Sequence, residues 1–130
     1  MKVLPVNATD DDLLQLVHDW VRLLEAGRYE EAFELTDHVP SSGWTPTLIK
    51  QCIEGYDEAL PNQHVTLQGV ANDIIQHIEV SRWISAKQCF VGDIWYDLNI
   101  NNVVSDLTAT FYICESLDGL YLSLNDIHVM

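Results

Sequence analysis

The sequence contains no lysine or arginine after Lys87, and only six basic residues in all. Twenty acidic residues give the 130-residue chain a formal net charge of −14. A field of this sign repels nucleic acid and anionic membranes, and it speeds the encounter with basic partners. We therefore expect neither nucleic-acid nor membrane binding, whereas a basic protein partner fits the charge. The acidity also fits a simple role in solubility.

Cysteine is scarce, since Cys52, Cys89 and Cys114 are odd in number, far apart and outside any C-x-x-C spacing. A disulfide framework or a zinc site is therefore not expected, and the thiols are expected to be reduced and partly buried. The five histidines show no H-x-x-x-H or H-E-x-x-H spacing. The sequence thus predicts no metal and no cofactor.

Long apolar runs and catalytic motifs are absent as well. No run approaches the ~20 apolar residues of a membrane span, and the first residues lack the apolar segment of a signal peptide. We therefore expect a cytoplasmic protein. The sequence has no G-x-S-x-G, Walker or G-x-G-x-x-G motif that would indicate an enzyme. No repeat or compositional break divides the chain, which predicts a single domain over residues 1–130.

The first half of the chain has the apolar spacing of helices. Thr9 is a natural N-cap with Asp12 as its capping-box partner, and leucines and valines follow at helical spacing. A second helix is predicted in the segment RYEEAFELTDH, and Thr45 caps a third helix with Pro46 at its first position. Helices are thus expected over about residues 9–59.

The second half changes to the pattern of strands. Four segments are rich in β-branched and aromatic residues or alternate between polar and apolar: 74–85, 88–100, 106–115 and 120–129. Asp118–Gly119 predicts a hairpin turn before the last of them. Because helices come first and antiparallel strands after, the sequence predicts an α+β fold. It would pack three N-terminal helices on a curved, mostly antiparallel, cone-like sheet of about four strands, with the sheet part over about 64–130.

The run WVRLLEAGRYEEAFELTDH, residues 20–38, resembles the opening of nuclear transport factor 2-like domains, also called cystatin-like or ketosteroid-isomerase-like. In those domains a first helix ends at a glycine, and a short helix of the type G-x-Y-x-x-A follows. The resemblance implies a sheet that curls around a pocket capped by helices. That superfamily includes enzymes, carriers and immunity proteins, so the resemblance does not select a function. No local motif matches the acid and donor set of its enzymes, and no catalytic residue is carried over.

The segment SLNDIHVM brings an acid and an imidazole close together at the end of the last strand. Asp126 and His128 are two positions apart and should share a face with Leu122 and Leu124. At about 6.6–7 Å along the strand, they are too far apart for a direct hydrogen bond, except through rotamer reach or a water. The pair forms either a pocket mouth or a strand end that runs into solvent, and we expect solvent.

The segment DIWYDLNI should place Asp93, Trp95 and Asp97 on one face of a strand and Tyr96 on the other. Tryptophan is typical of interface anchors, so a tryptophan between acids favours contact with a partner. These three residues and Trp44 are therefore the candidate partner-binding residues. The alternative is an ordinary exposed sheet face with Trp95 lying over its neighbours.

Two functions follow from these patterns. The first is a small acidic, non-enzymatic interaction domain, immunity-like or inhibitor-like, that binds a basic protein. The second is a small-molecule-binding protein or an isomerase- or dehydratase-like enzyme with a pocket between helices and sheet. The second would use Asp126 or Asp97 as base, with a pKa raised by burial, and Tyr96, Tyr112 or His128 as donor. We expect the first, and a homodimer through the open side of the sheet is compatible with either.

Overall fold

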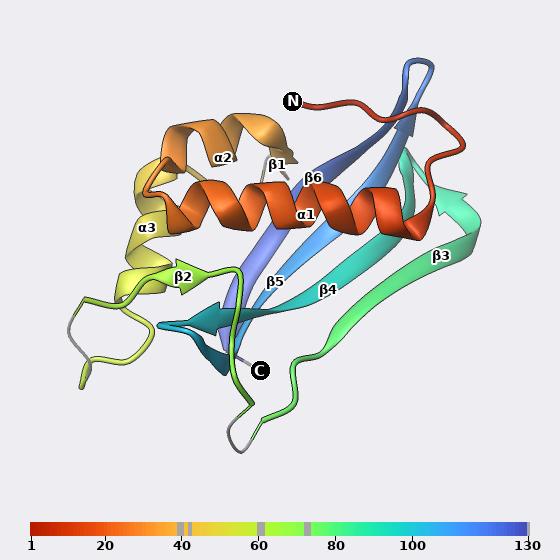
Figure 1. The fold of residues 1–130 in the computed structure, drawn as a ribbon. Helices are drawn as coiled ribbons and strands as arrows, with labels where there is room; N and C mark the ends of the chain where they lie inside the picture. The colour runs from red at the N-terminus through yellow and green to blue at the C-terminus, as the bar shows by residue number, and fades with distance from the viewer. Residues whose placement is uncertain (39–40, 42, 60–61, 72–73, 130) are drawn as a thin grey trace.

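The computed structural model describes residues 1–38, 41, 43–59, 62–71 and 74–129 (Figure 1). The helices are α1 (Asp10–Glu25), α2 (Tyr29–Leu35) and α3 (Pro46–Glu54). The strands are β1 (Asp37–His38), β2 (Val65–Thr66), β3 (Ile78–Lys87), β4 (Phe90–Ile100), β5 (Val103–Ser116) and β6 (Gly119–Val129). Within the described part of the chain, none of the helices has the length and apolar content needed to cross a membrane.

The helices begin where the sequence predicts. At the start of α1, the Thr9 hydroxyl accepts from the Asp12 amide at 3.2 Å, and the Asp12 carboxylate accepts from the Thr9 amide at 2.9 Å. This reciprocal pair is the predicted capping box. The Thr45 hydroxyl likewise accepts from the amide of Leu48 at 3.0 Å, with Pro46 in the first turn of α3. The capping predictions are confirmed.

The sheet has six strands in the order β1-β6-β5-β4-β2, and β3 also pairs with β4. Adjacent strands among the four long ones, β3 to β6, are antiparallel, whereas the short strand β1 runs parallel to β6. β2 pairs with the last two residues of β4, beyond the part of β4 that β3 covers. The hairpin predicted at Asp118–Gly119 joins β5 to β6.

The predicted fold class is wrong. Strand residues outnumber helical ones, and a six-stranded sheet curled like half a barrel replaces the predicted cone-like sheet of about four strands with three N-terminal helices. The predicted division between a helical part and a sheet part also fails, because β1 lies between α2 and α3. β1 and β2 have two residues each, which is too short for an alternating pattern. They exist because β6 and β4 offer backbone partners, which only the folded chain provides.

The helices cover one face of the sheet, and α1 lies across β4, β5 and β6 (Figure 1). The indole of Trp20 on α1 meets the ring of Phe111 on β5 edge to face, with centroids 5.1 Å apart. Both side chains are fully buried. Around them pack buried side chains of α1 and the sheet: Leu13, Leu16, Leu24, Ile94, Leu98, Ile113, Leu122 and Leu124. Apolar side chains therefore fill the space between α1 and the sheet.

A β-bulge at Asn125 changes which way the end of β6 faces. Thr110 pairs with Asp126 whereas Phe111 pairs with Leu124, so Asn125 is an extra residue in β6. Leu124 therefore points into the core while Asp126 points to the opposite face. The prediction that Asp126 and His128 share a face with Leu122 and Leu124 is wrong for this reason.

Candidate functional site

The face of the sheet opposite α1 carries a polar and aromatic surface drawn from four strands. We call it the open face, and its side chains come from Glu79 on β3, Asp93, Trp95 and Asp97 on β4, Thr108, Thr110 and Tyr112 on β5, and Asp126 and His128 on β6. No helix of the described chain covers it (Figure 1). A hollow of about 240 Å³ lies there, and its lining includes Asp93, Trp95, Thr110, Tyr112, Asn125 and His128.

Strand register aligns two acids and a tryptophan in one row across the open face. Glu79 pairs with Trp95, Trp95 pairs with Thr110, and Thr110 pairs with Asp126. Since neighbouring strands lie about 4.8 Å apart, the two acids bracket the row at a separation of about 14 Å. The carboxylates are accessible, with side-chain exposures of 60% for Glu79 and 51% for Asp126.

The open face carries acids and almost no bases. β4, β5 and β6 contain no lysine or arginine. On β3, Arg82 turns to the helical side, where its guanidinium donates to Asp10 at 2.9 Å and to the carbonyl of Ala8 at 3.0 Å. Lys87 stands at the far end of β3, beside the turn into β4. The open face is therefore locally negative on a negatively charged protein.

Aromatic side chains extend the open face toward the β3–β4 turn. The Tyr112 ring stacks on Phe90 with centroids 4.5 Å apart and meets Trp83 edge to face at 6.0 Å. The Trp83 indole N–H points to an Asp93 carboxylate oxygen at 3.4 Å. The three aromatic side chains and Asp93 are all half-buried. They combine apolar area with accessible polar atoms, as in the anchoring residues of protein interfaces.

Asp97 is a buried carboxylate that the protein's own donors occupy. One oxygen accepts from the Trp95 indole at 3.0 Å and from the Thr108 hydroxyl at 2.7 Å, and the other accepts from the His77 amide at 2.9 Å. Only 7% of the residue is exposed. These bonds fix the Trp95 indole, which the His77 ring also meets edge to face at 5.8 Å. Asp97 therefore orients Trp95 and is poorly placed to act as a base.

Asp126 and His128 are in direct contact, through the rotamer reach that the prediction from strand spacing left open. The imidazole Nδ1 lies 3.0 Å from an Asp126 carboxylate oxygen, although the alignment is not that of a hydrogen bond. The other carboxylate oxygen accepts from the Ile127 amide at 2.9 Å. The side chains reach each other through their rotamers, and the pair forms a charge contact when the imidazole is protonated.

Two predicted site residues lie elsewhere. Tyr96 is 2% exposed on the helical side of the sheet, where its ring meets His18 edge to face at 5.8 Å. Burial raises the pKa of the Tyr96 hydroxyl. Trp44 is 9% exposed, and its indole donates to the carbonyl of Asn125 at 2.9 Å. Tyr96 is thus separated from Asp126 and His128 by the sheet, and Trp44 supports the bulge of β6 instead of facing a partner.

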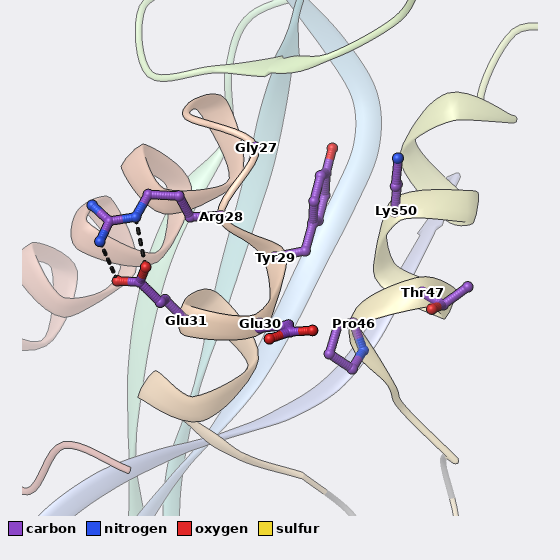
Figure 2. A pocket seen from close by; sticks show the side chains of 8 residues that line it. All are labelled: Gly27, Arg28, Tyr29, Glu30, Glu31, Pro46, Thr47 and Lys50. Carbon is purple, nitrogen blue, oxygen red and sulfur yellow. Dashed lines mark hydrogen bonds and ion pairs between the residues drawn. The ribbon is translucent and has the colours of Figure 1, made fainter.

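A second hollow of about 420 Å³ lies between the start of α2 and α3 (Figure 2). Tyr29 and Lys50 face each other across it, with the ammonium 5.9 Å from the ring centroid. The Lys50 ammonium also lies 3.7 Å from Glu54, and the Arg28 guanidinium makes a two-pronged contact with Glu31 at 2.6 and 2.7 Å. Since both cations already have acidic partners, this hollow offers a ligand little unpaired charge.

The described residues contain no group of three His, Cys, Asp or Glu side chains arranged to hold a metal ion. The sequence missed Trp83, Thr110 and Asn125 as residues of the open face. Alternation along β5 could have placed Thr110 there. Asn125 depends on a bulge, and Trp83 lies within the register shift between Arg82 and Lys87. Neither irregularity leaves a periodic signal.

Comparison with known proteins gives one family match. A family model described as "Domain of unknown function (DUF7668)" matches residues 21–130. This range includes α2, α3 and every strand, together with the last residues of α1. Neither the curated proteins nor the solved structures contain a significant match.

Proposed function

Because the chain belongs to this family of domains of unknown function, we propose its function from the site itself: the open face binds a basic protein, as an immunity or inhibitor protein does. The row Glu79–Trp95–Thr110–Asp126 is the observation that carries the proposal. It places a fixed indole between two accessible carboxylates. A partner that inserts an apolar group over the indole could bring lysine or arginine to both acids.

Preorganisation supports this role. Asp97 and His77 hold the Trp95 indole in one orientation, so binding would cost little side-chain entropy there. The negative field of the whole chain would steer a cationic partner from a distance and raise its association rate at low salt. Binding of this kind should weaken as ionic strength rises.

The enzyme alternative has less support. It needs a cavity between the helices and the sheet, where Trp20, Phe111 and leucines are fully buried against each other. Its candidate groups also lie on two sides of the sheet, with Tyr96 under α1 and Asp126 on the open face. The resemblance to nuclear transport factor 2-like domains stays a prediction, and the proposal does not depend on it.

The proposal can be tested with a lysine-rich peptide of alternating basic and apolar residues as probe. Affinity is measured by calorimetry at low and high salt, and amide shifts are mapped by NMR. Replacing Glu79 by glutamine and Asp126 by asparagine should weaken binding about tenfold, because the two exposed charge contacts of the row contribute about 0.7 kcal/mol each. The shifts should concentrate on β4, β5 and β6.

The matched control replaces Asp11 by Asn and Glu34 by Gln. Asp11 is exposed at the start of α1 and Glu34 is exposed on α2, and the double variant has the same net charge as the test variant. It should change affinity less than about twofold. Equal losses of affinity in the two double variants would show that the peptide responds only to net charge, which would overturn the assignment of the open face as the binding surface.

A further inference from the structure

Two of the three cysteines, which the sequence places far apart, meet where the β3–β4 turn lies beside β5. Cys89 is the last residue of that turn, and its carbonyl accepts from the amide of Glu115 on β5 at 2.9 Å. Cys114 pairs with Phe90, the residue that follows Cys89. Cys89 is also one of the causes that raise the pKa of the Cys114 thiol, as expected of neighbouring thiols. Strand pairing therefore holds the two cysteines side by side.

Tyr121 completes the cluster from β6. It is the cross-strand neighbour of Cys114, and its hydroxyl points to the Cys89 sulfur at 3.9 Å. The Cys89 sulfur thus has a phenolic donor beside it, and a hydrogen bond from such a donor stabilises a reacting thiolate.

The two cysteines differ in access. Cys89 is half-exposed and lines a surface hollow of about 410 Å³, together with Gln88, Val91 and Glu115. Cys114 is 1% exposed. Burial raises the pKa of the Cys114 thiol to about 12, with the neighbouring Cys89 as a further cause. A reagent in solvent can therefore reach Cys89 first, whereas Cys114 is buried and remains a protonated thiol.

We infer that Cys89 and Cys114 form a peroxide-reactive thiol pair that closes to a disulfide. The Cys89 sulfur attacks one oxygen of hydrogen peroxide, so that an S–O bond forms and the O–O bond breaks. The second oxygen leaves as water with the Cys89 thiol proton. The Cys114 sulfur then attacks the sulfenic sulfur, an S–S bond forms, and the sulfenic oxygen leaves as water with the Cys114 proton. Two electrons pass from the two sulfurs to the peroxide.

The charge of the protein selects the class of oxidant. Glu115 lines the hollow beside Cys89, and the chain as a whole carries −14. An anionic disulfide such as oxidised glutathione is repelled by this field, whereas a neutral hydroperoxide is not. Hydrogen peroxide should therefore oxidise the pair faster than oxidised glutathione does at the same concentration, and the difference should shrink at high salt.

The test treats the reduced full chain with stoichiometric hydrogen peroxide and follows free thiols and intact mass. The expected product is a monomer that has lost two hydrogens and two of its three thiols, regains both with a phosphine reductant, and yields a peptide joining Cys89 to Cys114. Cys52→Ser serves as the control, since Cys52 lies on α3 away from the pair, and it should give the same cross-link at the same rate.

Variants of the pair separate its two roles. Cys114→Ser should stop at the sulfenic acid, one oxygen heavier, without a cross-link. Cys89→Ser should lose thiols roughly tenfold more slowly than the wild type, because the remaining partner is buried. Tyr121→Phe should slow the first step about threefold through loss of one hydrogen bond.

The result that overturns the inference is a wild-type chain that gains oxygens with no cross-link, or whose cross-link involves Cys52 or a second molecule. Loss of thiols at the wild-type rate in Cys89→Ser would also overturn the inference. If a substitution prevents folding, the peptide map of the oxidised wild type decides the question without it.

Discussion

At the scale of single residues, the buried Asp97 carboxylate accepts three hydrogen bonds. Replacing Asp97 by alanine leaves the Trp95 indole, the Thr108 hydroxyl and the His77 amide without their common acceptor. We expect the free energy of unfolding to fall by about 3 kcal/mol, because buried donors that lose a charged acceptor keep their desolvation cost. Urea denaturation followed by circular dichroism measures this loss.

Asp93 provides the matched control on the same strand and the same face. It is half-buried, and the hydrogen bond of its side chain with the Trp83 indole is long at 3.4 Å. Asp93→Ala should therefore cost less than about 1 kcal/mol. If both variants lose the same stability, Asp97 is not the structural centre of the open face.

The residues of β4 show how far alternation carries a prediction. It correctly placed Asp93, Trp95 and Asp97 on one face and Tyr96 on the other. It could not distinguish an available carboxylate from an occupied one, because the donors to Asp97 come partly from His77 and Thr108, far along the chain. Burial of Trp44 was missed for the same reason, since its acceptor lies 81 positions away.

At the scale of elements, the bulge in β6 depends on contacts from two directions. The Trp44 indole donates to the backbone carbonyl of Asn125 at 2.9 Å, and the Asn125 side-chain amide donates to the Thr110 hydroxyl at 3.2 Å. Trp44→Phe removes the first of these and part of the buried indole. We expect a loss of about 1–2 kcal/mol and faster hydrogen exchange in residues 122–128.

Trp83→Phe is the control for that prediction. Trp83 is half-exposed at the periphery of the open face, so in the phenylalanine variant the Asp93 carboxylate can bond to water in place of the indole N–H. Trp83→Phe should therefore leave amide hydrogen exchange in β6 unchanged. Faster exchange spread evenly over all strands in Trp44→Phe would contradict a specific role at the bulge.

Long elements could be predicted from the sequence because their signals are local. The Thr9 capping box and the proline in the first turn of α3 lie in sequence next to what they determine. β1 and β2 could not be predicted, since each consists of two residues that pair with a distant strand. The fold class was wrong chiefly because these short strands and the irregularities of β3 and β6 are set by tertiary contacts.

At the scale of the whole molecule, tyrosine ionisation should limit stability at high pH. Burial is the main cause that raises the pKa of four tyrosines above the ordinary value of 10.0: Tyr29, Tyr56, Tyr96 and Tyr121. A raised pKa in the folded state means that the folded chain holds these protons more tightly than the unfolded chain. The stabilisation is complete below pH 10 and is lost as the pH rises through the folded values. The added negative charge works in the same direction.

Thermal unfolding between pH 8 and pH 12, with tyrosinate absorbance recorded in parallel, measures this effect. The unfolding temperature should begin to fall near pH 9, because burial also raises the pKa of the Cys52 and Cys114 thiols, and should fall more steeply above pH 10, with the tyrosinate absorbance change coinciding with unfolding. Tyr96→Phe should make the fall shallower, because it removes the most deeply buried of these phenols. A normal tyrosine titration in a chain that remains folded would contradict the prediction.

The extra residue at position 125 also has a consequence for how this domain can vary in evolution. Insertions and deletions are tolerated in surface turns, but within a strand their parity matters, since side chains alternate. Losing Asn125 alone would remove the bulge and leave Leu124 paired with Phe111 and Asp126 paired with Thr110, so Asp126, His128 and the core residue Ile127, 5% exposed, would keep their faces. Relatives that lack one residue of β6 should therefore lack it at position 125, whereas a single-residue gap elsewhere in the strand would reverse the faces on one side of it and mark a domain with a different open face.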